Sequence, residues 1–369
     1  MKKHSTTTRS STGSKKEQRG WKTIGMDLGD KTSRYCVLQS NGEVEWEASV
    51  PTSKKGLSQA FSQTSRCRIA LEVGTHSPWV SRLLKQWGHE VIVANARQVR
   101  LISQSSSKDD RLDARTLARL ARVDPQLLHP IRHRSEKAQG HLLTIRVRAL
   151  LVETRTALVN AARGFSKANG ERLASCAAES MTVDILKGLG EELEEALKPL
   201  VEQVESLSQQ IKTCDAKIEQ IARVDYPETK LLKQVSGVGT LIALSFVLTV
   251  DDRERFQKSR DVGSYVGLRP QRSQSGARDP QLGISKEGDR YLRTLLVQGA
   301  HYILGWRGPD TDLRRWGLAL AARGGKNAKK RAVVAVARKL AVLLHRLWAT
   351  GEVYEPLRNH PAESGCKAA

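Results

Sequence analysis

Short apolar stretches, separated by polar turns, begin the patterned part of the chain. Three of them follow one another at Thr23–Leu28, Arg34–Gln39 and Glu43–Val50. Asn41-Gly42 lies between the second and the third, and this dipeptide is a strong signal of a two-residue β-hairpin turn. The pattern therefore predicts three strands that follow one another as a β-meander.

The next stretches alternate between strand and helix patterns. Cys67–Glu72 and Glu90–Ala94 are short and apolar and predict strands, and Pro78–Trp87 between them predicts a helix. From Asp110 to Val123 the apolar residues recur at helical spacing. A meander followed by strand, helix, strand and helix is the element order of an RNase H-like α/β fold, in which the first and fourth strands are neighbours.

The middle of the chain is predicted to be helical and carries the clearest period in the sequence. One face of Leu143–Val159 is apolar, and a later run of apolar residues recurs every three and four positions. The residues of this seam are Leu193, Leu197, Leu200, Val204, Leu207, Ile211, Cys214, Ile218 and Ile221. Such a heptad seam predicts coiled-coil packing, with Pro199 off the seam. Two interpretations stay open: a hairpin with the 143–159 helix, or a coiled coil between two chains that forms a dimer.

A glycine-containing turn marks the last third of the chain, which begins near Tyr226. Gly237 and Gly239 lie directly before the apolar helix predicted over Leu241–Val250. Glycines at the start of a helix expose backbone N–H groups, and such groups bind phosphate. The segment resembles the helix-hairpin-helix loops that hold the DNA backbone, and a plain turn between two helices is the alternative.

The charge balance indicates a polyanionic partner. The chain has 61 Lys and Arg against 39 Asp and Glu, a net charge of +22, which favours a nucleic acid. A membrane protein is not indicated, because Leu241–Val250 is the longest apolar run and is too short to span a bilayer. The basic N-terminus lacks the apolar core of a secretory signal, and the five scattered cysteines form no zinc pattern. We expect a cytoplasmic protein of a reducing compartment.

Four acidic residues occupy the positions that a metal-dependent nuclease of the RNase H type would need. Asp27 and Glu72 each end a predicted strand, and Asp110 and Asp113 lie three residues apart on one face of a predicted helix. Carboxylates at these positions are able to converge on Mg²⁺, with Mn²⁺ as a substitute, and Mg²⁺ is the usual ion for attack on phosphodiesters. Taken singly, each acid could instead be a helix cap or a surface charge.

The last third also carries a candidate nucleophile. Ser275 precedes a glycine and lies between Arg272 and Arg278, where a hydroxyl could act on a phosphate. Loops rich in Ser and Gly are usually plain loops, and no His or Asp nearby is an evident base. Ser273 lies two residues away, and spacing alone does not choose between the two serines.

Basic residues gather on two further predicted helices, one beginning near Gly288 and one over 326–346. They form rows that fit phosphate neutralisation, although a solvated helix face is the alternative. The candidate nucleic-acid contacts are Arg272, Lys286, Arg290, Arg293, Lys326, Lys329, Lys330 and Arg331, together with Gly237 and Gly239.

The order of these motifs resembles the DEDD transposases of bacterial insertion sequences, the IS110 family that includes the Piv-type DNA invertases. The stretches that carry the likeness are Ile24–Asp27, Leu71–Thr75, Lys108–Ala114, Val235–Gly239, Gly267–Pro270, Gln274–Gly276 and Gly283–Arg293. They span almost the whole folded chain, and their joint order is far more specific than any one of them. The segments Arg323–Ala328 and Val336–Leu340 look most similar to the IS1111 branch.

The resemblance implies a mechanism and partners. Asp27, Glu72, Asp110 and Asp113 would be metal ligands of a RuvC-like domain, and Ser275 would attack a DNA phosphate to form a covalent phosphoserine. Members work as oligomers, here a dimer or a tetramer, with residues of the two domains meeting between subunits. An RNA encoded by the element pairs with donor and target DNA, so that base pairing reads the sequence.

The predicted organisation is therefore an α/β domain followed by helical regions. Its parts are a disordered basic arm (1–20), a RuvC-like domain (21–132), a helical coiled-coil segment (133–225), a mostly helical transposase domain (226–350) and a loose tail (351–369). The resemblance implies a recombinase that excises and inserts its own element. The rival hypotheses are a RuvC-like Holliday-junction resolvase, in which Ser275 is only a loop residue, and a nucleic-acid-binding protein without catalysis.

Overall fold

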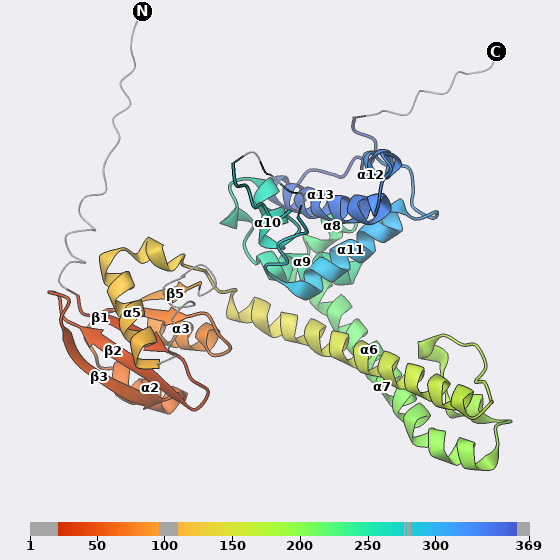
Figure 1. Cartoon of the computed structure of the whole chain (residues 1–369), viewed down its shortest axis with the longest axis horizontal. Helices are drawn as coiled ribbons and strands as arrows, with labels where there is room; N and C mark the ends of the chain where they lie inside the picture. The colour runs from red at the N-terminus through yellow and green to blue at the C-terminus, as the bar shows by residue number, and fades with distance from the viewer. Residues whose placement is uncertain (1–20, 96–109, 277, 279, 281, 360–369) are drawn as a thin grey trace, which may run out of the picture. The chain divides into compact units, whose positions relative to one another are not determined.

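The computed structural model describes residues 21–95, 110–276, 278, 280 and 282–359 (Figure 1). The chain divides into two compact units, Met1–His133 and Arg134–Ala369. The first unit contains a β-sheet and helices, and the second is helical, so the predicted mixture of an α/β part and a helical part is confirmed. The arm and the end of the tail, predicted over 1–20 and 351–369, lie partly or wholly outside the described residues.

The first unit is built on one five-stranded sheet with the order β3-β2-β1-β4-β5. Its strands are β1 (Thr23–Asp27), β2 (Thr32–Leu38), β3 (Val44–Pro51), β4 (Arg68–Glu72) and β5 (Glu90–Ala94). Strands β1, β2 and β3 form the predicted antiparallel meander. Strand β1 pairs in parallel with β4, and β4 with β5, so the prediction that the first and fourth strands are neighbours is confirmed.

Helices cover both faces of this sheet. Helices α2 (Lys54–Phe61) and α3 (Ser77–Gln86) pack on one face, where Ile24, Met26, Ile69 and Leu71 are buried. Helix α5 (Asp110–Val123) packs on the other face, against Gly25, Cys36 and Ala70. The sequence analysis did not predict α2, because only Leu57 and Phe61 of its eight residues point into the core, too few to show a helical period.

Helix α5 approaches the sheet closely because β1 has a glycine at the crossing. A Cβ atom on Gly25 would lie 1.9 Å from the carbonyl oxygen of Ala114 and 2.4 Å from the amide nitrogen of Ala118. Only hydrogen fits there. At the other end of the contact, two guanidinium nitrogens of Arg115 donate to Oε1 of Glu47 on β3, at 2.9 and 2.7 Å. Gly25 and this ion pair together fix where the acid-bearing start of α5 lies on the sheet.

The second unit begins with a long helical hairpin of α6 (Glu136–Ala168) and α7 (Glu191–Asp225). The two helices run antiparallel, as the contacts of Arg148 with Asp215 and of Arg155 with Ser208 show. The seam residues of α7 are buried or half-buried against α6 and the connecting segment. Of the two interpretations left open, the structure shows the hairpin within one chain, and α7 continues through Pro199.

The remaining helices form one core around α9, which is buried on all sides. They are α8 (Thr229–Leu232), α9 (Thr240–Val250), α10 (Val262–Tyr265), α11 (Arg290–Leu304), α12 (Asp312–Ala322) and α13 (Ala328–Thr350). Leu244 and Leu248 of α9 also pack on the base of the hairpin. The prediction that a helix begins at Lys326 is wrong by two residues, because Asn327 has a left-handed backbone (φ 65°) and α13 begins after it. Helix α12 was not predicted.

Candidate active site and nucleic-acid interface

Two of the predicted acids lie side by side at one edge of the sheet. Asp27 ends β1 and Glu72 ends β4, and the register pairs Met26 with Leu71 just before them. Successive residues of a strand alternate between faces, so Asp27 shares a face with Gly25 and Glu72 shares one with Ala70. Helix α5 covers that face. Both carboxylates therefore end on the side of the sheet where the third acid is found.

The third acid, Asp113, is half-buried in the first turn of α5. Its charge acts on Glu72: partial burial, and then the negative charge of Asp113, raise the pKa of the Glu72 carboxyl. Burial and a like charge both disfavour the ionised form, and nearby positive charge would reverse the effect. Asp113 is therefore near enough to Glu72 for its charge to act on that carboxyl, and the role of both residues as metal ligands stays a prediction.

The donor chemistry of this cluster, named here the acidic edge (Asp27, Glu72 and Asp113), fits a hard divalent cation such as Mg²⁺. Asp110 opens α5, but its side chain lies outside the described part of the structure. Among the described side chains, no three His, Cys, Asp or Glu residues are close enough to hold a metal ion. The pKa of Glu72 is raised first by burial and then by the charge of Asp113, and a divalent cation bound nearby would oppose both effects.

One cation near the acidic edge was missed by the sequence analysis. Arg34 on β2 is the register partner of Asp27 and is half-buried. Directly opposed residues of an antiparallel pair share a face, so Arg34 lies on the same side as the carboxylates. The signal that could have found it is the meander itself, since pairing β1 with β2 around their turn places residue 34 opposite residue 27.

Ser275 lies near the tip of a hairpin-like loop in the second unit. Pro270 and Ile284 pair at the root of this loop, named here the serine loop (269–285), and Ser275 pairs with Arg278 near its tip. The backbone N–H of Ser275 donates to the carbonyl of Arg278 at 3.0 Å, and that of Arg278 donates back at 3.1 Å. Ser275 and Ser273 are both exposed, so exposure does not choose between them.

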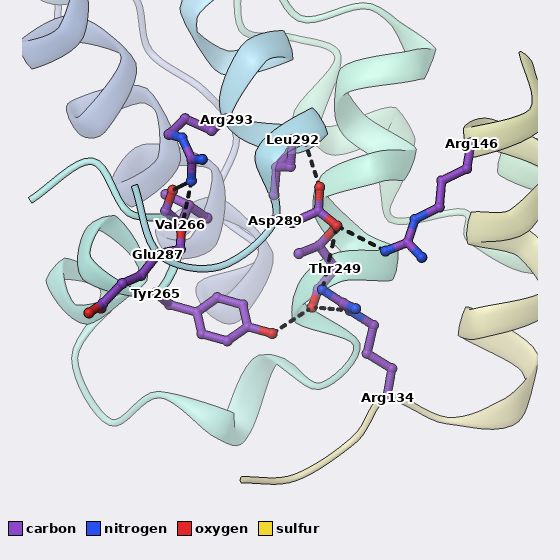
Figure 2. A network of polar contacts seen from close by, with 9 residues as sticks. All are labelled: Arg134, Arg146, Thr249, Tyr265, Val266, Glu287, Asp289, Leu292 and Arg293. Carbon is purple, nitrogen blue, oxygen red and sulfur yellow. Dashed lines mark hydrogen bonds and ion pairs between the residues drawn. The ribbon is translucent and has the colours of Figure 1, made fainter. Parts of the chain in front are cut away.

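The root of the serine loop is held by two glycines and one arginine. Gly267 and Gly288 both have positive φ angles (70°), and a Cβ atom on either would lie within 2.2 Å of a backbone oxygen across the root. Arg293 donates from Nη1 to the carbonyl oxygens of Glu287 (2.7 Å) and Val266 (3.0 Å), as Figure 2 shows. The structure gives Arg293 this internal contact, and its predicted contact with phosphate stays a prediction.

Asp289 joins the start of α11 to the base of the hairpin (Figure 2). Its Oδ1 accepts from the backbone N–H of Leu292 at 2.9 Å and so caps α11, while Oδ2 lies 3.3 Å from Arg146 and 3.8 Å from Arg134. Only 9% of the Asp289 side chain is exposed. Arg134 also donates to the carbonyl of Thr249. One carboxylate therefore ties α6 to the helix that follows the serine loop.

The two glycines before α9 have different surroundings. Gly237 (φ 84°) packs against α11, where a Cβ atom would lie 2.9 Å from the carbonyl oxygen of Gly299 and 3.1 Å from Tyr302. Gly239 is the N-cap of α9 and is exposed. Gly237 is therefore explained by packing, whereas a Cβ atom on Gly239 would meet nothing within 4 Å, and the predicted contact of Gly239 with phosphate stays a prediction.

Some of the predicted basic residues line one large groove of about 1090 Å³ in the second unit. Lys326, Lys330 and Arg331 lie along it, while Lys286, Arg290 and Lys329 are exposed elsewhere. Among the described residues, the basic lining of this groove is Arg260, Arg323, Lys326, Lys330, Arg331, Arg338 and Lys339. Arg260, Arg323, Arg338 and Lys339 were missed, because they come together only when α12, α13, the root of the serine loop and the short 3-10 helix Ser259–Asp261 pack against one another. We name this surface the basic groove.

Two family models match the chain. The model described as "Transposase", the DEDD domain of IS110 elements, matches residues 24–165, from β1 into α6. The model described as "Transposase IS116/IS110/IS902 family" matches residues 229–313, from α8 to the start of α12. The first match contains all four predicted acids and the second contains Ser275, whereas most of α12 and all of α13 lie outside both.

Three relatives are similar over most of their length. The transposase for insertion sequence element IS1111A of Coxiella burnetii is 28% identical over 92% of this chain and 94% of its own. A protein of Sinorhizobium fredii named as a transposase, y4pF/y4sB, is 30% identical over 90% of this chain and 85% of its own. The transposase for element IS1328 of Yersinia enterocolitica is 28% identical over 76% and 83%.

The α/β unit with its acidic edge, the helical unit and the two matches define the class of the DEDD transposases. The chain belongs to the IS110 family of transposases. It is thus an enzyme that cleaves and rejoins DNA, and DNA is its substrate. In the part of the chain that the structure describes, no helix is long and apolar enough to cross a membrane.

Proposed function

We propose that this transposase is an RNA-guided recombinase that excises and inserts its own insertion sequence through a phosphoserine intermediate. The observation that carries the proposal is that the adjacent strands β1 and β4 end in Asp27 and Glu72, on the face that α5 and its Asp113 cover, because this gathers negative charge where a nuclease would need it. The exposed position of Ser275 near the tip of a loop with a fixed root supports the second part. RNA guidance rests on the resemblance to the family and on the net charge of +22.

The acidic edge would hold Mg²⁺, with Mn²⁺ as a substitute, through Asp27, Glu72 and Asp113, and through Asp110. A bound divalent ion supplies positive charge to the non-bridging oxygens of a phosphate. The contribution of the chain is to fix the carboxylates before the ion arrives: β1 and β4 hold two of them by their ladder, and the close crossing of α5 over Gly25 holds the third. Arg34 beside Asp27 is able to orient that carboxylate or to contact the phosphate itself.

In the serine step, Oγ of Ser275 bonds to the phosphorus of one DNA strand, and the bond from phosphorus to the leaving sugar oxygen breaks. The hydroxyl proton passes, directly or through solvent, to the leaving oxygen, so the strand ends as a free hydroxyl and a phosphoserine. The phosphoester bond is conserved, and a sugar hydroxyl of another strand is able to reverse the step and reseal the DNA without ATP. Gly239, Lys286 and Arg290 are proposed to hold the nucleic-acid backbone during this exchange.

An oligomer is part of the proposal, and the hairpin offers a surface for it. The heptad seam of α7 is used within the chain, but α6 exposes Leu143, Val147 and Leu150 at 61%, 44% and 62%. These residues are spaced by four and three positions, so they form one apolar stripe along the helix. Exposed apolar stripes of this kind favour helix–helix contact with a second copy. Size-exclusion chromatography with light scattering should show a smaller species for Leu143→Glu/Leu150→Glu, and an unchanged mass would contradict this part.

A covalent-trapping assay tests the chemistry. The protein is incubated with Mg²⁺, the structured RNA that flanks its gene, and labelled donor and target DNA, and the products are separated under denaturing conditions. We expect a protease-sensitive protein–DNA adduct that is lost in Ser275→Ala and in Asp27→Ala, and also on addition of EDTA. Ser273→Ala is the matched control and should keep the adduct. Omission of the RNA should abolish adduct formation.

Each rival hypothesis predicts a different result. Cleaved DNA without any adduct, still produced by Ser275→Ala, would assign the chain to the resolvase type and reject the serine step. An adduct that forms equally well without RNA would reject guidance and leave the serine chemistry in place. Loss of the adduct in Ser273→Ala instead of Ser275→Ala would move the nucleophile by two residues.

A further inference from the structure

The basic groove gathers positive charge from several elements of the second unit. Among the described residues, seven Lys and Arg line it and no acidic residue does. Among the described residues, Arg260, Arg323 and Lys330 have no ion-pair partner, and the contact of Arg331 is with a backbone carbonyl, that of Gly324. Repulsion between gathered cations destabilises the free protein, and a polyanion bound in the groove would remove this cost.

The same groove has an apolar wall, which distinguishes it from a simple basic patch. Pro270, Ile284, Trp316 and Leu320 line it alongside the cations. Nζ of Lys339 lies 3.8 Å from the centroid of the Trp316 ring, so a cation and an aromatic surface are presented together. The backbone of a duplex offers charge but no exposed base faces, because its bases are paired and stacked. An unpaired strand offers both, and grooves for such strands combine cations with apolar and aromatic side chains.

The groove also lies at the root of the serine loop. Pro270 and Ile284, which pair across that root, are two of its lining residues. Ser275 follows Pro270 by five residues, a reach of at most about 17 Å along an extended chain. A strand that lies in the groove is therefore within a short distance of the proposed nucleophile.

We propose that the basic groove binds an unpaired strand of DNA or RNA, with its phosphates on the lysines and arginines and its bases against the apolar wall. The role of the bound strand as a substrate or guide in recombination rests on the proposed function. Binding itself requires neither Ser275 nor a metal ion, so an experiment is able to reject strand binding by the groove without rejecting the serine mechanism, and the reverse.

The binding test uses the full chain in EDTA, where no strand is cut. Fluorescence anisotropy is measured with a labelled single-stranded DNA, the RNA of the same sequence, and the duplex DNA. The groove variant is Lys326→Gln/Lys330→Gln, and the matched control is Lys198→Gln/Lys212→Gln on α7, which removes two exposed lysines outside the groove. We expect the groove variant to bind single strands at least tenfold more weakly while its duplex affinity changes less than threefold. The control should bind all probes as the wild type does.

Two further readouts separate charge from base contact. The slope of log affinity against log salt for single strands should fall by about 1.4 in the groove variant, since each lost phosphate contact removes about 0.7. A strand of abasic nucleotides keeps every phosphate but should bind the wild type roughly tenfold more weakly than the normal strand, because base contacts are lost. Trp316→Leu should narrow that difference. The abasic comparison uses the wild type alone and holds even where a variant fails to fold.

Several results would overturn the inference. Equal loss of single-strand and duplex binding in the groove variant would make the groove a general backbone site, and unchanged single-strand binding would remove the groove from recognition. Displacement of the strand by polyglutamate at equal charge concentration would show a site for acidic peptides.

Two other results would support the inference. Preference for the RNA probe or the DNA probe identifies the source of the strand, and either preference supports the inference. Groove-dependent binding without any covalent adduct would retain the inference and reject the serine mechanism.

Discussion

The acidic edge and the serine loop hold their candidate reactive groups in opposite ways. Asp27 and Glu72 directly follow paired residues of two adjacent strands, so the backbone ladder fixes them. Ser275 is five residues from the pair at the root of its loop, and beyond that root backbone hydrogen bonds join Gln271 to Gly283 and Ser275 to Arg278. The acids are thus positioned by regular structure, whereas the serine is positioned by contacts at a distance from it. Carboxylates that hold a cation need fixed positions, and the strand ends supply them. A serine that attacks a phosphate must approach it and later release it, and a loop anchored only at its root suits that movement.

The largest expected effect tests the acidic edge. Gly25→Ala places a methyl group where the backbone of α5 lies, so α5 must move away from the sheet. We expect the first unit to lose at least about 3 kcal/mol of stability, since the clash is with backbone and cannot be relieved by a rotamer change. Thermal unfolding followed by circular dichroism measures this. Gly164→Ala in α6, where a Cβ atom meets nothing within 4 Å, is the control and should gain about 0.5–1 kcal/mol.

The next effect tests how the serine loop is anchored. Asp289→Ala removes the cap of α11 and leaves Arg146 and Arg134 without their shared carboxylate. A loss of about 2 kcal/mol is expected from denaturant unfolding, because a cap and a nearly buried ion pair are lost together. Asp289→Asn keeps the cap and should lose less. Asp310→Ala breaks an exposed pair with Arg315 and should leave the melting temperature unchanged. Equal effects of the two Ala variants would argue against Asp289 as an anchor.

A smaller and more local effect is expected at Arg293. Arg293→Gln removes two hydrogen bonds to carbonyls at the root, so the serine loop should open more often. Tryptic cleavage after Arg272 and Arg278, followed by peptide mapping, should become roughly 30-fold faster, as expected for the loss of two hydrogen bonds of about 1 kcal/mol each. Arg290→Gln removes an exposed neighbour on the same helix and should leave these rates unchanged. If Arg293 instead contacts only phosphate, both variants will behave alike in the absence of nucleic acid.

The smallest effect is the pH dependence of Glu72. Its pKa is raised in the folded state from an ordinary value of 4.5, through burial and the charge of Asp113. The folded state therefore binds the proton more tightly, and the stability that Glu72 contributes is fully present below pH 4.5 and is lost as pH rises through the raised pKa. In EDTA, the wild type should gain stability relative to Glu72→Gln as pH falls through this window. Asp113→Asn should make the gain smaller, and no pH dependence of the difference would contradict the pairing.

The sequence predicted the elements that carry the acidic edge well, because these elements depend on local patterns. Short apolar stretches predicted the strands, the order of the elements predicted that β1 and β4 are neighbours, and the helical spacing of apolar residues predicted α5. Arg34 was missed, although the register that places it opposite Asp27 follows from the same meander. Helix α2 was missed because two buried residues carry too little period to be recognised.

The basic groove could not be predicted in the same way. Arg260 lies in the short 3-10 helix Ser259–Asp261, Arg323 at the end of α12 and Arg338 in α13, and they line one groove only because these elements pack together. A row of charges on one helix was visible in the sequence, but the apolar wall beside it was not. The same limit explains Arg293: its spacing from Arg290 suggested a phosphate contact, whereas the fold brings two carbonyls within its reach. The choice of Ser275 over Ser273 stays with the resemblance, since both are exposed.

The hairpin of α6 and α7 has a consequence for how such an enzyme could change through evolution. Its base is fixed by packing on α9 and its far end by a separate cluster around Met181 and Leu197, while the helices between them repeat one seam. Removing or adding seven residues in both helices would preserve that seam and change the length of the hairpin by about 10 Å. The hairpin is thus a spacer whose length is able to differ between the transposases of related elements, while the packing at its two ends stays the same.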